Sequence, residues 1–470
     1  MKNSLLLLLL SASINAQTFT LDSTNNLPNI VLGDVKLVDV DGDDNLDLFL
    51  TGVDDSSGTS IRISKLYLND GIGNFTESSS TFEALDNSTV DFADIDGDID
   101  LDLIISGRDN LNQGVSILYT NNGSGVFTEL TSANLISVSG SVEFADIDGD
   151  NDNDLLIVGD MLAALYINDG SGNFTTVSSN ITGTDFGDIE FQDIDGDLDL
   201  DLLVVGSASG STTNKAKLYR NDGLGVFTEI TGSNLFLASF SSVSFGDIDG
   251  DLDSDLIITG QSNTETATKL YINDGSGNFT EDTSIVIEQV TFGEAVFEDI
   301  NDDNSLDIII TGSNTSNTSI TKAYINDSNG NFTELSQIFE GLGFLSRIEI
   351  GDINGDGDKD IFSIGSNLNG DTTTNLYKNN LYTLSINNFI SDKTIIYPNP
   401  AQTYIHIETT TAINLYTIYD ISGKLVLKEN VTNMNGKKVK IDLSNLNIGS
   451  YIIQIELSDS SILRRKIIKT

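Results

Sequence analysis

One acidic nonapeptide occurs seven times along the chain, and it constrains the fold more than any other feature. The copies begin at Asp39, Asp94, Asp146, Asp193, Asp247, Asp299 and Asp352, at intervals of 47 to 55 residues. Each copy reads D-x-[DN]-[GD]-D-x-x-x-D, as in residues 94–102. A repeat of about 50 residues is typical of propellers and solenoids. The sequence therefore predicts one repeat array over most of its length.

Each acidic segment lies between two short apolar runs rich in β-branched residues, for example residues 142–145 and 256–260. A third run ends in Leu-Tyr-x-Asn, with Ala323-Tyr324 in the sixth copy, and a turn then leads to a fourth run that begins Phe-Thr. Such runs bounded by glycine are typical of strands. Four antiparallel strands repeated seven times predict an all-β chain with a seven-bladed β-propeller.

The two ends of the repeat array complement each other. The seventh copy stops at Asn379 without a Phe-Thr strand, whereas a spare Phe19-Thr20 precedes the first copy. We therefore expect the N-terminal strand to complete the seventh blade, which would cover an otherwise open sheet edge.

The nonapeptide has the composition of a cation-binding loop. Positions 1, 3, 5 and 9 are Asp or Asn in every copy, position 4 is Gly in six copies, and position 7 varies, as a backbone carbonyl ligand would permit. Acidic turns without an ion are the alternative, because Asp favours turns. However, four or five carboxylates within nine residues repel one another unless a cation is present, and oxygen ligands suit Ca²⁺.

We thus expect up to seven Ca²⁺ ions, one for each blade. A Gly at position 4, and not at 6, and the absence of Glu at position 12 argue against an EF-hand. The candidate ligands are Asp39, Asp41, Asp43, Asn45 and Asp47; Asp94, Asp96, Asp98, Asp100 and Asp102; Asp146, Asp148, Asp150, Asp152 and Asp154; Asp193, Asp195, Asp197, Asp199 and Asp201; Asp247, Asp249, Asp251, Asp253 and Asp255; Asp299, Asn301, Asp303, Ser305 and Asp307; and Asp352, Asn354, Asp356, Asp358 and Asp360.

These residues resemble the FG-GAP, or VCBS-type, repeats of integrin-α-like β-propellers. The resemblance covers about residues 17–380 and depends on D-x-D-G-D-x-x-x-D-L followed by an apolar run that ends in Gly. It implies Ca²⁺ in the first hairpin of each blade. The sixth copy departs from the pattern at Asn301, Asp302 and Ser305, so we expect it to be the weakest site.

Composition changes along the chain and divides it into regions. Lys2, the apolar Leu5–Leu10 and Ala16 predict a signal peptide over residues 1–16; a propeller over 17–382, a linker over 383–394 and a C-terminal domain over 395–470 follow. No apolar stretch reaches the ~20 residues of a membrane span.

Net charge is −51 over the first 389 residues and +3 thereafter. Such an acidic chain is not expected to bind nucleic acid, because that binding requires cationic side chains in contact with phosphate groups.

The C-terminal domain resembles the type A sorting domain of Bacteroidetes type IX secretion. The matching residues are Tyr397–Ala401, 420–424, 441–443 with Leu446, 449–451 and the basic end 466–469. Short alternating strands predict a small Ig-like β-sandwich. The resemblance implies secretion machinery as a partner and an extracellular or cell-surface location. An Ig-like module that binds something else is the alternative.

The sequence favours a binding or adhesion module over an enzyme. The only histidine, His406, lies in the C-terminal domain, and there is no cysteine. The expected partner is an unknown extracellular protein or glycan; a lyase-like polysaccharide-active enzyme and a structural scaffold are the alternatives. We expect any partner on the face opposite the acidic loops, where the loops vary most. Phe236, Phe240, Phe339 and Phe344 are the candidate exposed aromatic residues.

Overall fold

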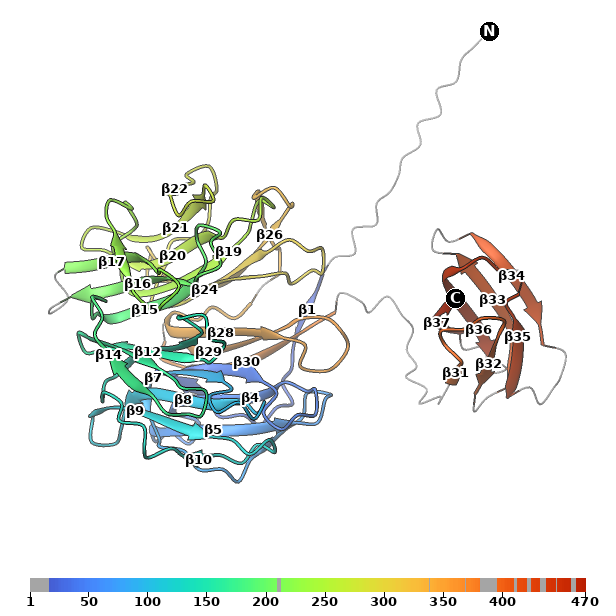
Figure 1. Ribbon diagram of the computed structural model, residues 1–470, viewed down its shortest axis with the longest axis horizontal. Helices are drawn as coiled ribbons and strands as arrows, with labels where there is room; N and C mark the ends of the chain where they lie inside the picture. Colours follow the sequence, from blue (N-terminus) through green and yellow to red (C-terminus); the bar gives the residue numbers. More distant parts are fainter. Residues whose placement is uncertain are drawn as a thin grey trace, which may run out of the picture. The chain divides into compact units, whose positions relative to one another are not determined.

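A computed structural model describes residues 17–208, 213–337, 339–367, 369–380, 395–409, 412–420, 424–431, 437–444, 446–457 and 462–470. The signal peptide and the linker predicted above lie outside these residues. The chain divides into two compact units between Leu384 and Ser385 (Figure 1). None of the described residues belongs to a helix that is long and apolar enough to cross a membrane.

The first unit is all-β and contains seven antiparallel sheets, consistent with a β-propeller. The first three sheets contain β2 (Ile30–Val31), β3 (Val35–Val38), β4 (Asp47–Asp54), β5 (Ile61–Asn69) and β6 (Phe75–Glu77); β7 (Asp86–Ala93), β8 (Asp102–Arg108), β9 (Gly114–Thr120) and β10 (Thr128–Glu129); and β11 (Gly140–Ala145), β12 (Asp154–Gly159), β13 (Leu162–Ile167) and β14 (Thr175–Val177). The fourth and fifth contain β15 (Asp185–Gln192), β16 (Asp201–Ala208), β17 (Thr213–Arg220) and β18 (Thr228–Ile230); and β19 (Ser239–Gly246), β20 (Asp255–Gln261), β21 (Thr266–Asn273) and β22 (Phe279–Glu281). The sixth contains β23 (Val290–Thr291), β24 (Ala295–Glu298), β25 (Asp307–Asn314), β26 (Ser319–Asn326) and β27 (Phe332–Glu334).

The seventh sheet joins the two ends of the unit. It contains β28 (Phe344–Gly351), β29 (Asp360–Ser366), β30 (Thr372–Asn379) and, at its edge, β1 (Phe19–Leu21). The pairing of β1 with β30 is antiparallel, with Phe19 opposite Asn379. The predicted closure by the N-terminal strand is confirmed.

The sheets fan out around a common axis (Figure 1). The first strands of neighbouring sheets contact one another, as β11 contacts both β7 and β15, so these strands surround the axis. In the first and sixth sheets this strand is broken into two pieces, β2 with β3 and β23 with β24. The second strands are the most deeply buried, and β12 is buried along its whole length. Apolar side chains of successive sheets form a shared core, for example Phe49 with Leu103.

The second unit consists of two sheets around one apolar cluster. One contains β31 (Ile395–Tyr397), β32 (Tyr404–Glu408) and β35 (Lys438–Asp442); the other contains β33 (Ile413–Asp420), β34 (Leu425–Asn430), β36 (Gly449–Leu457) and β37 (Ile462–Lys469). Ile405 of the first sheet and Ile453 of the second are fully buried in that cluster. His406 lies on β32, where its ring contacts Tyr397 and Tyr404.

Candidate functional site

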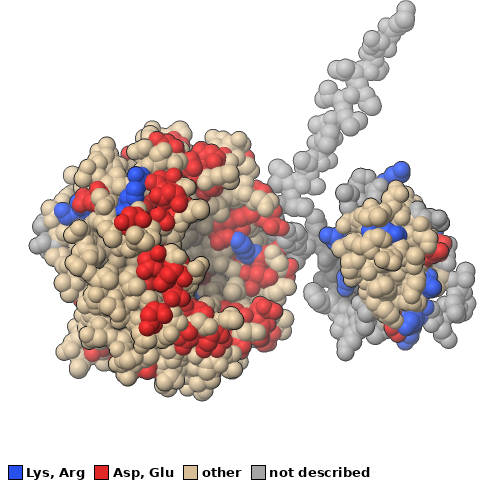
Figure 2. Space-filling view, in the orientation of Figure 1, with Lys and Arg blue, Asp and Glu red and all other residues tan. Residues whose placement is uncertain are grey.

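Each acidic loop connects the first strand of a sheet to the second. Position 9 is in every case the first residue of the second strand, as Asp102 begins β8. The seven loops thus lie at the same end of their sheets, and the inter-sheet segments lie at the other. Figure 2 shows Asp and Glu side chains gathered around a hollow on the visible face of the first unit.

The position 1 carboxylate shapes the loop. Asp94 Oδ1 accepts a hydrogen bond from the Gly97 N–H (2.8 Å), and Oδ2 accepts one from the Ile99 N–H (2.9 Å). The same two bonds, to positions 4 and 6, recur in the loops at Asp39, Asp146, Asp193, Asp247 and Asp352. A carboxylate that accepts two N–H groups in this way draws the chain into a tight turn.

Five loops bring three carboxylates together. One oxygen from each residue lies within 4.8 Å of the others, and the groups are Asp39, Asp41 and Asp43; Asp94, Asp96 and Asp102; Asp146, Asp148 and Asp154; Asp193, Asp195 and Asp197; and Asp247, Asp249 and Asp251. In the sixth and seventh loops position 3 is an amide, Asn301 or Asn354, so fewer carboxylates are available there. Amide and carboxylate oxygens are both ligands of Ca²⁺.

The position 3 carboxylates have the environment of metal ligands. The Oδ1 atoms of Asp41, Asp148 and Asp195 are buried and have no hydrogen-bond partner among the described residues. Burial, followed by repulsion from neighbouring carboxylates, raises the pKa of Asp41 and of Asp148. A buried charge without a partner is costly, and a hard cation would offset this cost. The residues present therefore fit Ca²⁺.

The position 9 carboxylate accepts hydrogen bonds from backbone N–H groups near the loop. Asp102 is almost fully buried; its Oδ1 accepts the Asn121 N–H (2.7 Å) and its Oδ2 the Ile95 N–H (3.1 Å). Burial raises the pKa of this carboxyl to about 6 and that of Asp154 to about 7. Only in the second and third loops does position 9 belong to one of the carboxylate groups just described.

Position 7 is not brought into these groups. In the first five loops its side chain lies against a glycine in the turn between the third and fourth strands: a Cβ atom on Gly123 would be 2.4 Å from Asp100 Oδ1, and one on Gly275 would be 2.3 Å from Asp253 Oδ2. The glycine makes room for the side chain of position 7. That this position binds an ion through its carbonyl oxygen remains a prediction.

The sequence analysis missed a residue that joins the loops to one another, namely the Asn of the Leu-Tyr-x-Asn motif. Asn121 Nδ2 donates to the carbonyl oxygen of Val40, at position 2 of the preceding loop (2.8 Å). The corresponding bonds of the other six sheets are made by Asn69, Asn168, Asn221, Asn273, Asn326 and Asn379. The occurrence of this Asn in all seven repeats was the signal that could have revealed it.

A second set of polar contacts, made by carboxylates, links first strands around the axis, except from β19 to β24, because β19 has no carboxylate. Carboxylates of one first strand accept backbone N–H groups of the next, as Glu143 accepts from Phe191 (3.1 Å) and Glu190 from Phe245 (3.1 Å). Related bonds involve Asp34, Asp91 and Glu294. Burial raises the pKa of Glu190 to about 8. Lys36 and Arg347 pair with acids of neighbouring sheets, and both line, with Glu143 and Glu190, one cavity around the axis, the axial channel.

Four phenylalanine rings form a row at the opposite end of the channel, where the first strands begin. The rings of Phe186, Phe240, Phe292 and Phe344 follow one another with centroids 4.9, 4.4 and 5.3 Å apart. Phe186 and Phe344, at the ends of this phenylalanine row, are 45% and 46% exposed. A cavity of about 100 Å³ beside the row is lined by Phe186, Arg108, Asp185 and other residues.

The phenylalanine row corrects part of the sequence prediction. Phe344 is exposed as expected, but Phe236 and Phe339 are buried, because the inter-sheet segments that carry them pack into the core. Phe236, for example, offers its N–H to the hydroxyl of the buried Tyr271 (2.9 Å). Phe240, also expected to be exposed, is half-buried, and the exposed Phe186 was not among the predicted residues.

Comparisons with known proteins give two family matches. Residues 39–105, 146–204, 193–258, 247–310 and 299–363 match the FG-GAP-like repeat, and together these segments cover more than half of the chain. Residues 395–470 match the secretion system C-terminal sorting domain. No curated protein matches the chain significantly.

Solved structures resemble the chain at low sequence identity. An Agrocybe aegerita lectin described as recognising non-reducing terminal N-acetylglucosamine is 14% identical with a TM-score of 0.47, over 81% of this chain and 93% of the lectin. PorZ, a surface component of the type IX secretion system of Porphyromonas gingivalis, is 12% identical with a TM-score of 0.42, over 90% of this chain and 58% of PorZ. A variant of AofleA from Arthrobotrys oligospora is 12% identical with a TM-score of 0.39, over 69% of this chain and 91% of that one.

Proposed function

Because the chain belongs to the FG-GAP-like repeat family and ends in a type IX sorting domain, which indicates export to the cell surface or the extracellular space, we propose that it is a calcium-stabilised binding or adhesion module. In this proposal the seven sheets are the seven blades of a propeller over residues 17–382. The C-terminal unit over 395–470 is an Ig-like sorting domain that engages the secretion machinery.

One observation supports the role of calcium above the others. Carboxylate oxygens of three residues approach within 4.8 Å in five loops, and in three loops one such residue has a buried oxygen without a hydrogen-bond partner. Positions 1, 3 and 5 would hold the ion in the first, fourth and fifth loops, and positions 1, 3 and 9 in the second and third. When bound, Ca²⁺ would neutralise the repulsion within the loop. Several carboxylates in a loop of nine residues suit Ca²⁺ better than the smaller, more strictly octahedral Mg²⁺.

Equilibrium dialysis of the full chain against Ca²⁺ tests this directly. We expect several ions per chain, up to seven, with dissociation constants as weak as about 10⁻⁴–10⁻³ M by analogy with extracellular modules. Mg²⁺ at the same concentration should compete poorly. If the chain binds fewer than two Ca²⁺ ions at a free Ca²⁺ concentration of about 10⁻² M, ten times the weakest expected dissociation constant, the loops are only acidic turns.

We place the partner at the phenylalanine row and the adjoining cavity. Contiguous exposed apolar patches mark interaction sites, and here two exposed rings lie at the ends of one continuous row. Phe186 (φ 50°), Phe240 (49°) and Phe292 (57°) are in left-handed backbone conformations. Such a conformation is unusual for a bulky residue, and conformations of this kind cluster at functional sites. Arg108, Arg347 and Asp185 add charges of both signs to the cavity.

The binding test uses matched variants on the two faces. The full chain with Ca²⁺ is applied to a glycan array and to extracellular proteins in a pull-down, and the partner found is then tested against Phe186→Ala and Leu252→Ala. Leu252 is 90% exposed at position 6 of the fifth loop and serves as the control. We expect only Phe186→Ala to abolish binding, with an unchanged melting temperature (Tm). Loss of binding in Leu252→Ala alone would place the partner on the loop face.

We propose binding and not catalysis. The axial carboxylates, which are the strongest candidates for acid–base chemistry, already accept backbone N–H groups of neighbouring strands, as Glu190 does from Phe245. Release of unsaturated sugars from polysaccharides by the full chain, lost in Glu190→Gln, would instead support the lyase-like alternative. A stable chain with neither a partner nor an activity would favour the scaffold.

A further inference from the structure

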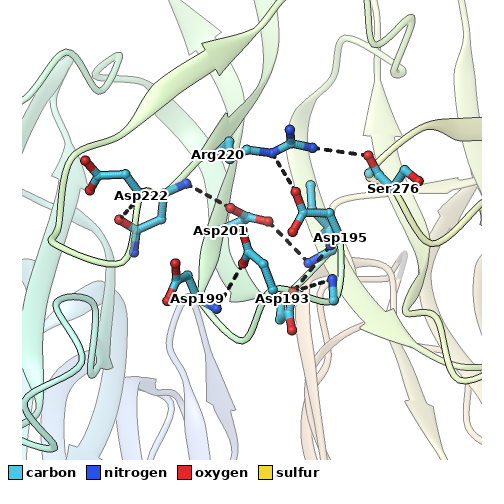
Figure 3. Close-up of polar contacts among 12 residues, drawn as sticks. Asp193, Asp195, Asp199, Asp201, Arg220, Asp222 and Ser276 are labelled. Carbon is cyan, nitrogen blue, oxygen red and sulfur yellow. Dashed lines mark hydrogen bonds and ion pairs between the residues drawn. The ribbon is translucent and has the colours of Figure 1, made fainter.

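The fourth loop differs from the others because a side chain of the protein supplies a cation to it. Arg220 is the variable residue of Leu-Tyr-x-Asn in the fourth sheet, at the end of β17. Its Nε lies 2.7 Å from Asp195 Oδ2, and its Nη2 donates to the carbonyl oxygen of Ser276 in the fifth sheet (3.2 Å). Figure 3 shows Arg220 between the loop and Ser276. The guanidinium group therefore connects two neighbouring sheets.

Asp195 is the position 3 residue of that loop and belongs to its carboxylate group with Asp193 and Asp197. Its side chain is only 12% exposed, whereas that of Arg220 is 45% exposed. The ion pair uses Oδ2 and leaves Oδ1 buried, with no hydrogen-bond partner in the part of the chain that the structure describes. An ion bound by this group would hence share one carboxylate with a guanidinium, which is always charged in proteins.

The fifth loop provides a natural comparison. Residues 193–199 and 247–253 have the same sequence, Asp-Ile-Asp-Gly-Asp-Leu-Asp, and both loops bring positions 1, 3 and 5 together. The position of Arg220 is occupied by Ile272 in the fifth sheet, and by Ile167 and Ile325 in two others. Apart from position 8, which is Leu200 in one loop and Ser254 in the other, the two loops thus differ in the presence of the guanidinium.

We infer that Arg220 is a tethered cation that takes over part of the role of calcium at the fourth loop. It weakens Ca²⁺ binding at this loop about tenfold relative to the fifth, because two cations that share one carboxylate repel each other. It also holds the fourth loop to the fifth sheet when calcium is absent. This inference rests on the proposed function, in which the loops bind Ca²⁺.

Hydrogen–deuterium exchange of the full chain, followed peptide by peptide across a Ca²⁺ titration, measures each loop separately. In the unmodified chain we expect the peptide covering 193–201 to reach half-protection at about tenfold more Ca²⁺ than the peptide covering 247–255. In EGTA the order should reverse, with residues 193–201 the better protected. Arg220→Ile should lower the midpoint of the fourth loop, meaning the Ca²⁺ concentration at half-protection, to that of the fifth loop. It should also remove the protection of the fourth loop in EGTA.

Ile272→Arg is the reciprocal variant and should raise the midpoint of the fifth loop while leaving the fourth unchanged. If Arg220→Ile leaves the midpoint of the fourth loop unchanged or raises it, while the other loops respond to Ca²⁺, Arg220 only orients or packs against Asp195 and the inference is wrong. If no loop responds to Ca²⁺, the proposed function fails and the inference fails with it.

Discussion

The sixth loop has less backbone freedom than the other loops because Asp302 stands where they have glycine. Asp302 occupies position 4, and its φ of 59° is in the left-handed region that glycine adopts without cost. In this loop Asp299 accepts from the N–H groups of Asp303 (3.2 Å) and Asn304 (2.8 Å). The position 7 residue is Ser305, whose hydroxyl bonds to that of Ser328 and adds no charge.

The sixth loop should consequently contribute least to calcium-dependent stability. Asp299→Ala should reduce the difference in Tm between Ca²⁺ and EGTA less than Asp247→Ala, because the stronger site has more binding free energy to lose. Thermal melts of both variants in both buffers check this ranking. A larger loss in Asp299→Ala would mean that the departures of the sixth loop do not weaken it.

At the level of the elements, β1 closes the unit through one buried side chain. Phe19 is 5% exposed and its ring lies 5.4 Å from that of Phe339, whereas Leu21 on the same strand is 45% exposed. Phe19→Ala should lower the free energy of unfolding by about 3–5 kcal/mol, the usual cost of removing a buried ring. Leu21→Ala is the control and should cost less than about 1 kcal/mol. Equal effects in chemical denaturation would show that β1 is not held by this packing.

The axial carboxylates connect the first strands and make stability depend on pH. Burial raises the pKa of Glu190 from 4.5 to about 8. Between these values the folded chain holds a proton that the unfolded chain has lost, so the free energy of unfolding falls as pH rises from about 4.5 to 8. The pKa values of Glu294 and Glu349 are raised to about 7. These two groups therefore also lower the free energy of unfolding as pH rises.

Glu190→Gln should therefore increase Tm at pH 8.5 and change it little at pH 4.5, in saturating Ca²⁺. Gln keeps the acceptor oxygen for the Phe245 N–H but has no charge to bury. Glu129→Gln, on an exposed strand, is the control for the loss of a surface carboxylate and should change Tm less than Glu190→Gln at pH 8.5. A fall in Tm at pH 8.5 in Glu190→Gln would mean that the ionised carboxylate stabilises the folded chain.

The elements could be predicted from sequence because every repeat carries the same local signals. The apolar runs, the Leu-Tyr-x-Asn motif and the spare Phe19-Thr20 are read within one repeat or by comparing its ends. Contacts between sheets could not be predicted in this way. The bond from Asn121 to Val40, the ion pair of Arg220 with Asp195 and the burial of Phe339 depend on how neighbouring sheets stack, which no local pattern specifies.

On the scale of the whole molecule, a first circuit, made by the Asn side chains between loops, joins the seven sheets into a ring, and the axial carboxylates add bonds between several of the first strands. The acidic loops lie directly beside the first circuit, since Val40 is at once a loop residue and the acceptor of Asn121. Repulsion within an ion-free loop should weaken the contacts between sheets. Calcium should then stabilise the ring as a whole.

The Tm of the full chain in 10 mM Ca²⁺, compared with EGTA and with 10 mM Mg²⁺, tests this claim most directly. With a dissociation constant of about 1 mM, each site adds about 1.4 kcal/mol, so several sites should raise Tm by roughly 10 °C in Ca²⁺ and far less in Mg²⁺. Equal melting temperatures in Ca²⁺ and EGTA would contradict the account, because a ligand that binds only the folded chain must stabilise it.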